Sequence, residues 1–139
     1  TRYTMSCPSW MQSLKAKNRL NKRKEELKMK VNDLIQMGVF KLINEGNNTD
    51  REISGVYCCD LLSIAMGKMP AGSAWVTVMS NINTLAVASL AEASCIILAE
   101  GSHMEPAGVA KAMEQGITVL ETELPVFDAA LAIYKALNA

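Results

Sequence analysis

Three short apolar runs recur at almost even spacing in the second half of the chain. They cover residues 73–79, 94–99 and 117–120, and the central residues of successive runs lie 21 and 22 positions apart. The stretches between them have helical patterns, with Pro106 and Gly116 placed where a helix begins and ends. Buried strands that alternate with helices are typical of β-α units and form parallel sheets. We therefore expect parallel strands whose carboxyl ends meet at one edge, where ligands of such sheets bind.

The rest of the globule fits the same pattern. We predict an α/β fold, a layered sandwich with a mainly parallel sheet built from consecutive β-α units and helices on both faces. Helix is expected at 31–37, 58–66, 82–91, 106–115 and 124–137, and strand at 39–43, 73–79, 94–99 and 117–121, with 51–57 extended. The helix at 82–91 is apolar almost all round and is expected to be buried. In the last helix, four residues at helical spacing are expected to pack on the core: Leu124, Phe127, Leu131 and Tyr134.

Charge divides the chain into two parts. Residues 1–30 carry nine Lys and Arg against two Glu, whereas residues 31–139 carry five against twelve Asp and Glu. We expect a basic arm over 1–28 that is helical or disordered. It is a solvated helix, a leader or an appended segment. The α/β domain follows over 29–139. Basic helices can bind nucleic acid or anionic lipid, but nucleic acid is not the expected partner.

Cysteine usage and hydropathy indicate the compartment. No apolar run approaches the roughly 18 residues that span a membrane, and the amino-terminal stretch lacks the apolar centre of a secretory signal. The cysteines are Cys7, Cys58, Cys59 and Cys95, without a Cys-x-x-Cys pair. We expect reduced, buried thiols, no membrane association and a cytoplasmic location.

The motifs that usually carry chemistry are missing. Gly67-Lys68 lacks the surrounding glycine and hydroxyl residues of a phosphate-binding loop, and no Gly-x-Gly-x-x-Gly follows a strand. His103 is the single histidine, so no Ser-His-Asp or Cys-His arrangement can be recognised, and its spacing to the cysteines matches no zinc pattern. We predict no catalytic residue, no cofactor and no metal, and hence a protein that is not an enzyme.

Polar residues gather where the three predicted strands end. Ser80 and Asn81 follow the first run, His103 and Glu105 follow the second, and Thr122 follows the third. The helix starts after these loops offer N–H groups and partial positive charge. Four acids near the same strand ends would repel a bare phosphate, although we expect them to be solvated: Glu100, Glu105, Glu121 and Glu123.

A second polar group precedes the extended run at 51–57. Arg51 is one of few cations in the globule, and it either faces an anionic group of a ligand or pairs with Asp50, Glu52 or Asp60. Gly55 tolerates unusual backbone angles at the end of this segment. Together with the acids, these residues favour a polar or nucleoside-like ligand over a polyphosphate.

Several segments in order resemble the DRTGG domain family. The signature segment is 50–55, in which Asp50, Arg51 and Gly55 match and the intervening Glu-Ile-Ser differs. Further matching stretches continue the resemblance over about residues 29–138: 56–57, 60–63, 66–67, 75–77, 86–90, 105–106, 116–117 and 122–123. The resemblance implies a regulatory domain, with a fold similar to the amino-terminal domain of HPr kinase and a proposed kinship to CBS modules that sense adenosyl ligands. Such domains occur alone or beside phosphotransacetylase and cobyrinate-synthase-like domains.

These observations predict a non-catalytic regulatory or ligand-sensing module that binds an adenine nucleotide or similar polar metabolite at the carboxyl ends of the strands. The alternative is a protein-interaction subunit that holds an enzyme partner, or a kinase-like one, without a small ligand. We expect a homodimer in either case. The predicted ligand-binding residues are Asp50, Arg51, Gly55, Ser80, Asn81, His103, Glu105 and Thr122.

Overall fold

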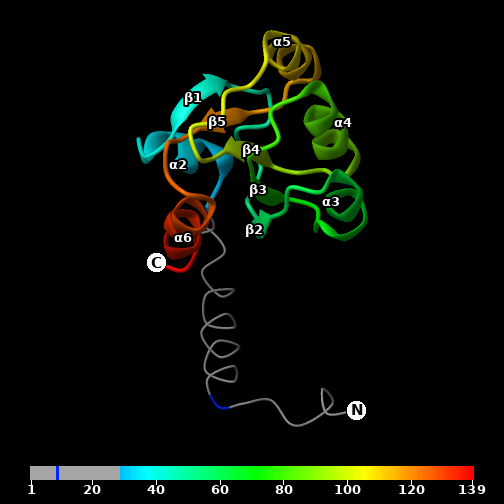
Figure 1. The fold of residues 1–139 in the computed structure, drawn as a ribbon. Helices are drawn as coiled ribbons and strands as arrows, with labels where there is room; N and C mark the ends of the chain where they lie inside the picture. The colour runs from blue at the N-terminus through cyan, green and yellow to red at the C-terminus, as the bar shows by residue number, and fades with distance from the viewer. Residues whose placement is uncertain (1–8, 10–28) are drawn as a thin grey trace, which may run out of the picture.

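The computed structural model describes residues 9 and 29–139 and has a five-stranded sheet with helices on both faces (Figure 1). The layered α/β fold predicted from the sequence is confirmed. The basic arm predicted for 1–28 lies, apart from residue 9, outside the described residues. In chain order the elements are α2 (Val31–Gln36), β1 (Lys41–Asn44), β2 (Gly55–Cys58), α3 (Leu62–Lys68), β3 (Ser73–Thr77), α4 (Ile82–Leu90), β4 (Cys95–Leu98), α5 (Pro106–Gln115), β5 (Val119–Glu121) and α6 (Val126–Leu137).

The sheet order is β1-β5-β4-β3-β2, and the four strands from β2 to β5 run parallel. Val76 pairs with Ile97, and Ile97 pairs with Leu120, so the three apolar runs lie side by side in one direction as predicted. We call the edge where β2–β5 end the carboxyl edge, and the opposite one the amino edge. β1 is antiparallel to β5, and Lys41 pairs with Glu121, so β1 starts at the carboxyl edge.

Side chains on the central strands alternate between two apolar layers. Trp75 and Ile96 pack in a cluster with buried residues of α3, α4 and α5, whereas Val76 and Ile97 pack with those of α2 and α6. Because both faces are covered, each residue of β3 and β4 is buried. This explains why these strands are continuous apolar runs rather than alternating ones.

The buried faces of two helices differ from the prediction. In α6 the residues buried against the sheet are Ala129 and Ile133, while Phe127 is 71% exposed and Tyr134 is 48% exposed. Leu124, which precedes α6, packs against the core as predicted, but Phe127 and Tyr134 do not, because α6 packs through the side that carries Ala129 and Ile133. The full burial predicted for α4 is also wrong at its ends, because Ile82 and Leu90 are exposed.

Local contacts explain where some elements begin and end. α5 covers the predicted range, and Gly116 ends it in the left-handed conformation with φ 69°. The helix predicted from residue 58 begins instead at Leu62, because Cys58 belongs to β2. Asp60 occupies the turn between them, where its carboxylate accepts hydrogen bonds from the Thr77 hydroxyl (2.8 Å) and the Val78 N–H (2.9 Å).

Over the part of the chain that the structure describes, every helix is too short or too polar to traverse a lipid bilayer.

Candidate ligand pocket at the carboxyl edge

A surface pocket of about 480 Å³ opens at the carboxyl edge, between the start of β1 and the loops that follow β4 and β5. Its walls combine apolar groups with charged and polar ones. The lining residues are Val39, Lys41, Gly101, Ser102, His103, Glu121, Thr122, Glu123, Leu124 and Pro125.

The loop after β4 is held in a sharp turn. Glu100 and Gly101 both have positive φ angles, of 60° and 74°. Their N–H groups donate to the carbonyl oxygens of Leu124 (2.8 Å) and Thr122 (3.0 Å), which fastens this loop to the loop after β5. A Cβ on Gly101 would also meet a carboxylate oxygen of Glu123 at 2.6 Å. The positive φ favours glycine at this turn, and a larger residue would also displace the end of the Glu123 side chain.

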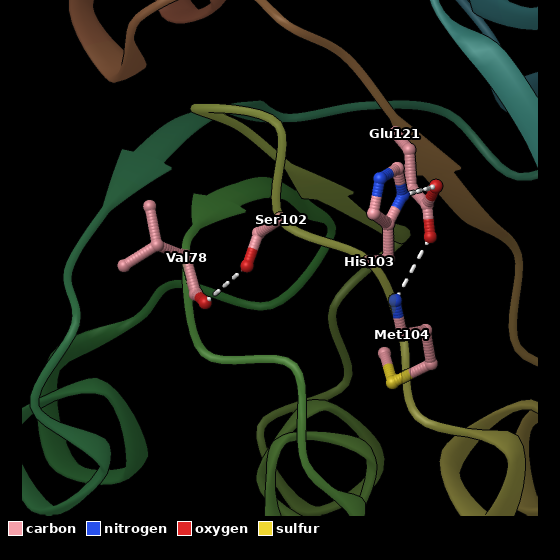
Figure 2. Close-up of polar contacts among 5 residues, drawn as sticks. All are labelled: Val78, Ser102, His103, Met104 and Glu121. Atoms are coloured by element: carbon pink, nitrogen blue, oxygen red, sulfur yellow. Dashed lines mark hydrogen bonds and ion pairs between the residues drawn. The ribbon is translucent and has the colours of Figure 1, made fainter.

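The other side of the loop is tied to the end of β3. The Ser102 hydroxyl donates to the Val78 carbonyl oxygen at 2.9 Å (Figure 2). The Glu105 N–H donates to the Ser80 carbonyl oxygen at 3.1 Å. The residues that position His103 are thus connected to both neighbouring loops.

His103 and Glu121 form the polar centre of the pocket. The Nδ1 atom of His103 lies 2.8 Å from Oε1 of Glu121, and the backbone N–H of Met104 donates to Oε2 at 2.9 Å (Figure 2). The Glu121 side chain is 8% exposed, whereas the His103 side chain is 71% exposed. Because the carboxylate accepts both hydrogen bonds, the proton of the neutral imidazole resides on Nδ1. Nε2 then carries a lone pair.

The four acids predicted to be solvated have different environments. Glu121 is buried, which corrects that expectation, because it ends a strand that is covered on both faces. Glu100 accepts the N–H of Val126 at 2.9 Å, and so it closes the start of α6. Glu123 lines the pocket, while Glu105 is exposed at the residue that precedes α5.

The predicted site residues at this edge fall into two groups. His103 and Thr122 line the pocket. Ser80, Asn81 and Glu105 lie in neighbouring loops at the same edge but do not line it. The side-chain oxygen of Asn81 is used as a helix cap, since it accepts the Asn83 N–H at 2.9 Å.

The remaining three predicted residues lie at the amino edge, so the structure does not unite all eight in one site. Gly55 pairs with Ser73 at the start of β3. The Arg51 carbonyl oxygen accepts the N–H of Val31 at 2.9 Å. Asp50 precedes this segment, which enters the sheet from the end opposite the pocket. For the same reason Arg51 does not pair with Asp60, whose carboxylate is bound at the carboxyl edge.

The sequence analysis did not identify Lys41, Glu121 or Gly101 as site residues. A signal for Glu121 was present: an acid that ends a buried strand must find hydrogen-bond donors, and His103 follows the neighbouring strand. Lys41 could be placed only after the antiparallel pairing of β1 with β5 was known.

The three cysteines that the structure describes do not line the pocket. Cys95 is fully buried, and burial raises the pKa of its thiol to about 12. Cys58, in contrast, is exposed, which corrects the expectation of uniformly buried thiols, and neither of these residues nor Cys59 is disulfide-bonded. Among residues 9 and 29–139, His, Cys, Asp and Glu form no cluster of three or more that could hold a metal ion.

No family model and no curated protein matches this sequence. A solved structure with a similar fold is the CBS and DRTGG domain portion of the regulatory region of Clostridium perfringens pyrophosphatase, in complex with its activator diadenosine tetraphosphate. The TM-score is 0.60 and the sequence identity is 17% over 76% of this chain. The match spans 46% of that chain, which is less than half of its length. At this identity the likeness concerns the fold.

Proposed function

We propose that this chain is a non-catalytic regulatory domain that binds a polar, nucleotide-like effector in the carboxyl-edge pocket. The observation that carries the proposal is the pocket itself, in which Glu121 orients His103 beside the apolar side chains of Val39 and Leu124. Apolar walls with a few placed polar groups are typical of small-molecule sites. The similar fold that was solved with diadenosine tetraphosphate supports the chemical class of the effector.

The surroundings of His103 favour binding over catalysis. A histidine base needs a nucleophile or a reacting group held beside it. The nearby Ser102 hydroxyl donates to the Val78 carbonyl oxygen, and the Cys95 thiol is fully buried. We also propose kinship with the DRTGG family, a cytoplasmic location and a domain that spans 29–139. In this view the signature residues Asp50, Arg51 and Gly55 join segments at the amino edge.

The proposal is tested by titrating the full chain with adenosine, AMP, ATP and diadenosine tetraphosphate while the melting temperature and the heat of binding are recorded. Ligand far above its dissociation constant should stabilise the fold by roughly 1–3 kcal/mol. His103→Ala should weaken binding of all four compounds, and Lys41→Ala should weaken binding of the three that carry phosphate. Lys68→Ala, which changes a lysine on α3 outside the pocket lining, should bind as wild type. Absence of heat and of a melting shift with all four compounds would reject the proposal.

The open edge of β2 favours a second candidate, a protein-interaction subunit. The N–H of Ser54 points inward to the Gly72 carbonyl oxygen, and that of Ile53 points outward to the Met29 carbonyl oxygen. Because the two directions alternate along a strand, the N–H groups of Gly55 and Tyr57 also point outward. No described strand lies beyond β2. An uncharged edge of this kind can pair with a second copy or with an enzyme partner.

This second candidate predicts a homodimer whose interface includes β2. Sedimentation of the full chain should then give twice the monomer mass, and Gly55→Pro, which removes one outward N–H, should lower it to the monomer mass. Lys68→Ala is the control and should leave the mass unchanged. A wild-type protein that sediments as a monomer, or a Gly55→Pro variant that remains a dimer, would reject pairing through this edge.

A further inference from the structure

Five backbone N–H groups around the pocket are already used by the protein. Phosphate sites generally present unpaired N–H groups from a loop or a helix start. Here the N–H groups of Glu100 and Gly101 donate to carbonyl oxygens, and that of Met104 donates to Glu121. The N–H groups of Val126 and Leu124, where α6 begins, donate to the Glu100 carboxylate and to the Thr122 hydroxyl oxygen. These five N–H groups are therefore not available to a phosphate.

The side chains of the pocket are richer in acceptors than in donors. Since Nδ1 of His103 donates to Glu121, Nε2 offers a lone pair, and the ring is exposed at the pocket. The carboxylate of Glu123 is a second acceptor in the lining, and Lys41 is the one Lys or Arg among the lining residues. With Glu121 and Glu123 ionised, these groups give the lining a net negative charge.

From this inventory we infer that the part of the effector that enters the pocket carries hydrogen-bond donors, such as the vicinal hydroxyls of a ribose, and that its phosphates stay outside. This inference rests on the proposed function and deepens it. Nε2 of His103 and the carboxylate of Glu123 accept from the hydroxyls, and the apolar groups of Val39, Leu124 and Pro125 cover the face of the sugar or base. Lys41 contacts a phosphate at the mouth of the pocket.

The inference is tested by calorimetric competition on the full chain with adenosine, 2′-deoxyadenosine, 3′-deoxyadenosine, AMP and inorganic phosphate. Loss of a hydroxyl that donates to one of these acceptors should weaken binding about tenfold or more for at least one deoxy analogue. AMP should bind within several-fold of adenosine, and inorganic phosphate should not displace adenosine. Lys41→Met should reduce the affinity for AMP and leave that for adenosine unchanged.

His103→Phe supplies a matched variant, because it keeps an aromatic ring and removes the acceptor. This variant should bind adenosine more weakly, and the difference in affinity between adenosine and the deoxy analogues should become smaller. If both deoxy analogues bind as tightly as adenosine, or if inorganic phosphate displaces adenosine, the inference is wrong while the proposed function stands. If no nucleoside or nucleotide binds, the proposed function fails and the inference fails with it.

Discussion

Glu121 determines which chemistry His103 can offer. A neutral histidine side chain in water carries its proton more often on Nε2, but the 2.8 Å contact between Nδ1 and a buried carboxylate reverses this preference. The second oxygen of Glu121 is held by the Met104 N–H, so the carboxylate cannot turn away. An exposed histidine on a loop thus becomes an oriented acceptor.

We predict that His103 in the full chain at neutral pH is the Nδ1–H tautomer. Because it is the single histidine of the chain, its ¹⁵N resonances in a long-range ¹H–¹⁵N spectrum need no assignment. The Nε2 shift should be that of an unprotonated nitrogen. Glu121→Gln should restore a mixture of tautomers, while Glu123→Gln, the control, should not. A wild-type spectrum dominated by Nε2–H would contradict the contact.

Gly101 and Gly67 are glycines in contrasting environments, so their alanine variants can be compared. Gly101 has φ 74° and faces the Glu123 carboxylate, whereas Gly67 lies in α3 with open space around it. Gly101→Ala should lower the free energy of unfolding by about 1–2 kcal/mol, because alanine is strained in this conformation. Gly67→Ala should raise it by about 0.5–1 kcal/mol. Urea denaturation measures both, and equal effects would refute the left-handed turn after β4.

Residue types alone placed His103 and Thr122 at the carboxyl edge, where both line the pocket, but they did not reveal the partner of the histidine. An acid near a strand end is most often solvated, and its burial follows from the two helical layers that cover β5. That Arg51 lies at the opposite edge from His103 was not predicted, for a related reason. The sequence shows that the charge is present but not at which end of the sheet it lies.

At the scale of elements, apolar periodicity located the strands and helices but not the buried side of each helix. α6 has two apolar stripes at helical spacing, one with large side chains and one rich in alanine. The alanine stripe packs on the sheet because it allows close approach, and Ile133 fills the contact. The size of the side chains in the sequence therefore does not predict which side of α6 faces the sheet.

Substitutions in α6 distinguish the two stripes. Ile133→Ala should destabilise the fold by about 2–5 kcal/mol, because it opens a cavity in a fully buried position. Phe127→Ala should change the free energy of unfolding by no more than about 0.5 kcal/mol, since the ring is 71% exposed. Chemical denaturation followed by circular dichroism measures both values. A larger loss of unfolding free energy for Phe127→Ala than for Ile133→Ala would show that α6 packs through the other face.

At the scale of the whole molecule, the parallel sheet separates two kinds of polar residue. The amino edge is closed by structural bonds, such as that from the Ser94 hydroxyl to the Glu52 carbonyl oxygen and that from the Asn48 amide to the Ser94 carbonyl oxygen. The carboxyl edge has the pocket. The spacing of three apolar runs was enough to predict that parallel strands end together at one edge, and the pocket opens at that edge.

The most direct test is to map adenosine binding on the full chain by ¹H–¹⁵N correlation spectroscopy. If the pocket is the effector site, the amide resonances that move will belong to residues 39–41, 101–105 and 121–124, and those of 48–55 will stay in place. Shifts that gather at 48–55 instead would put the ligand at the amino edge and contradict the account.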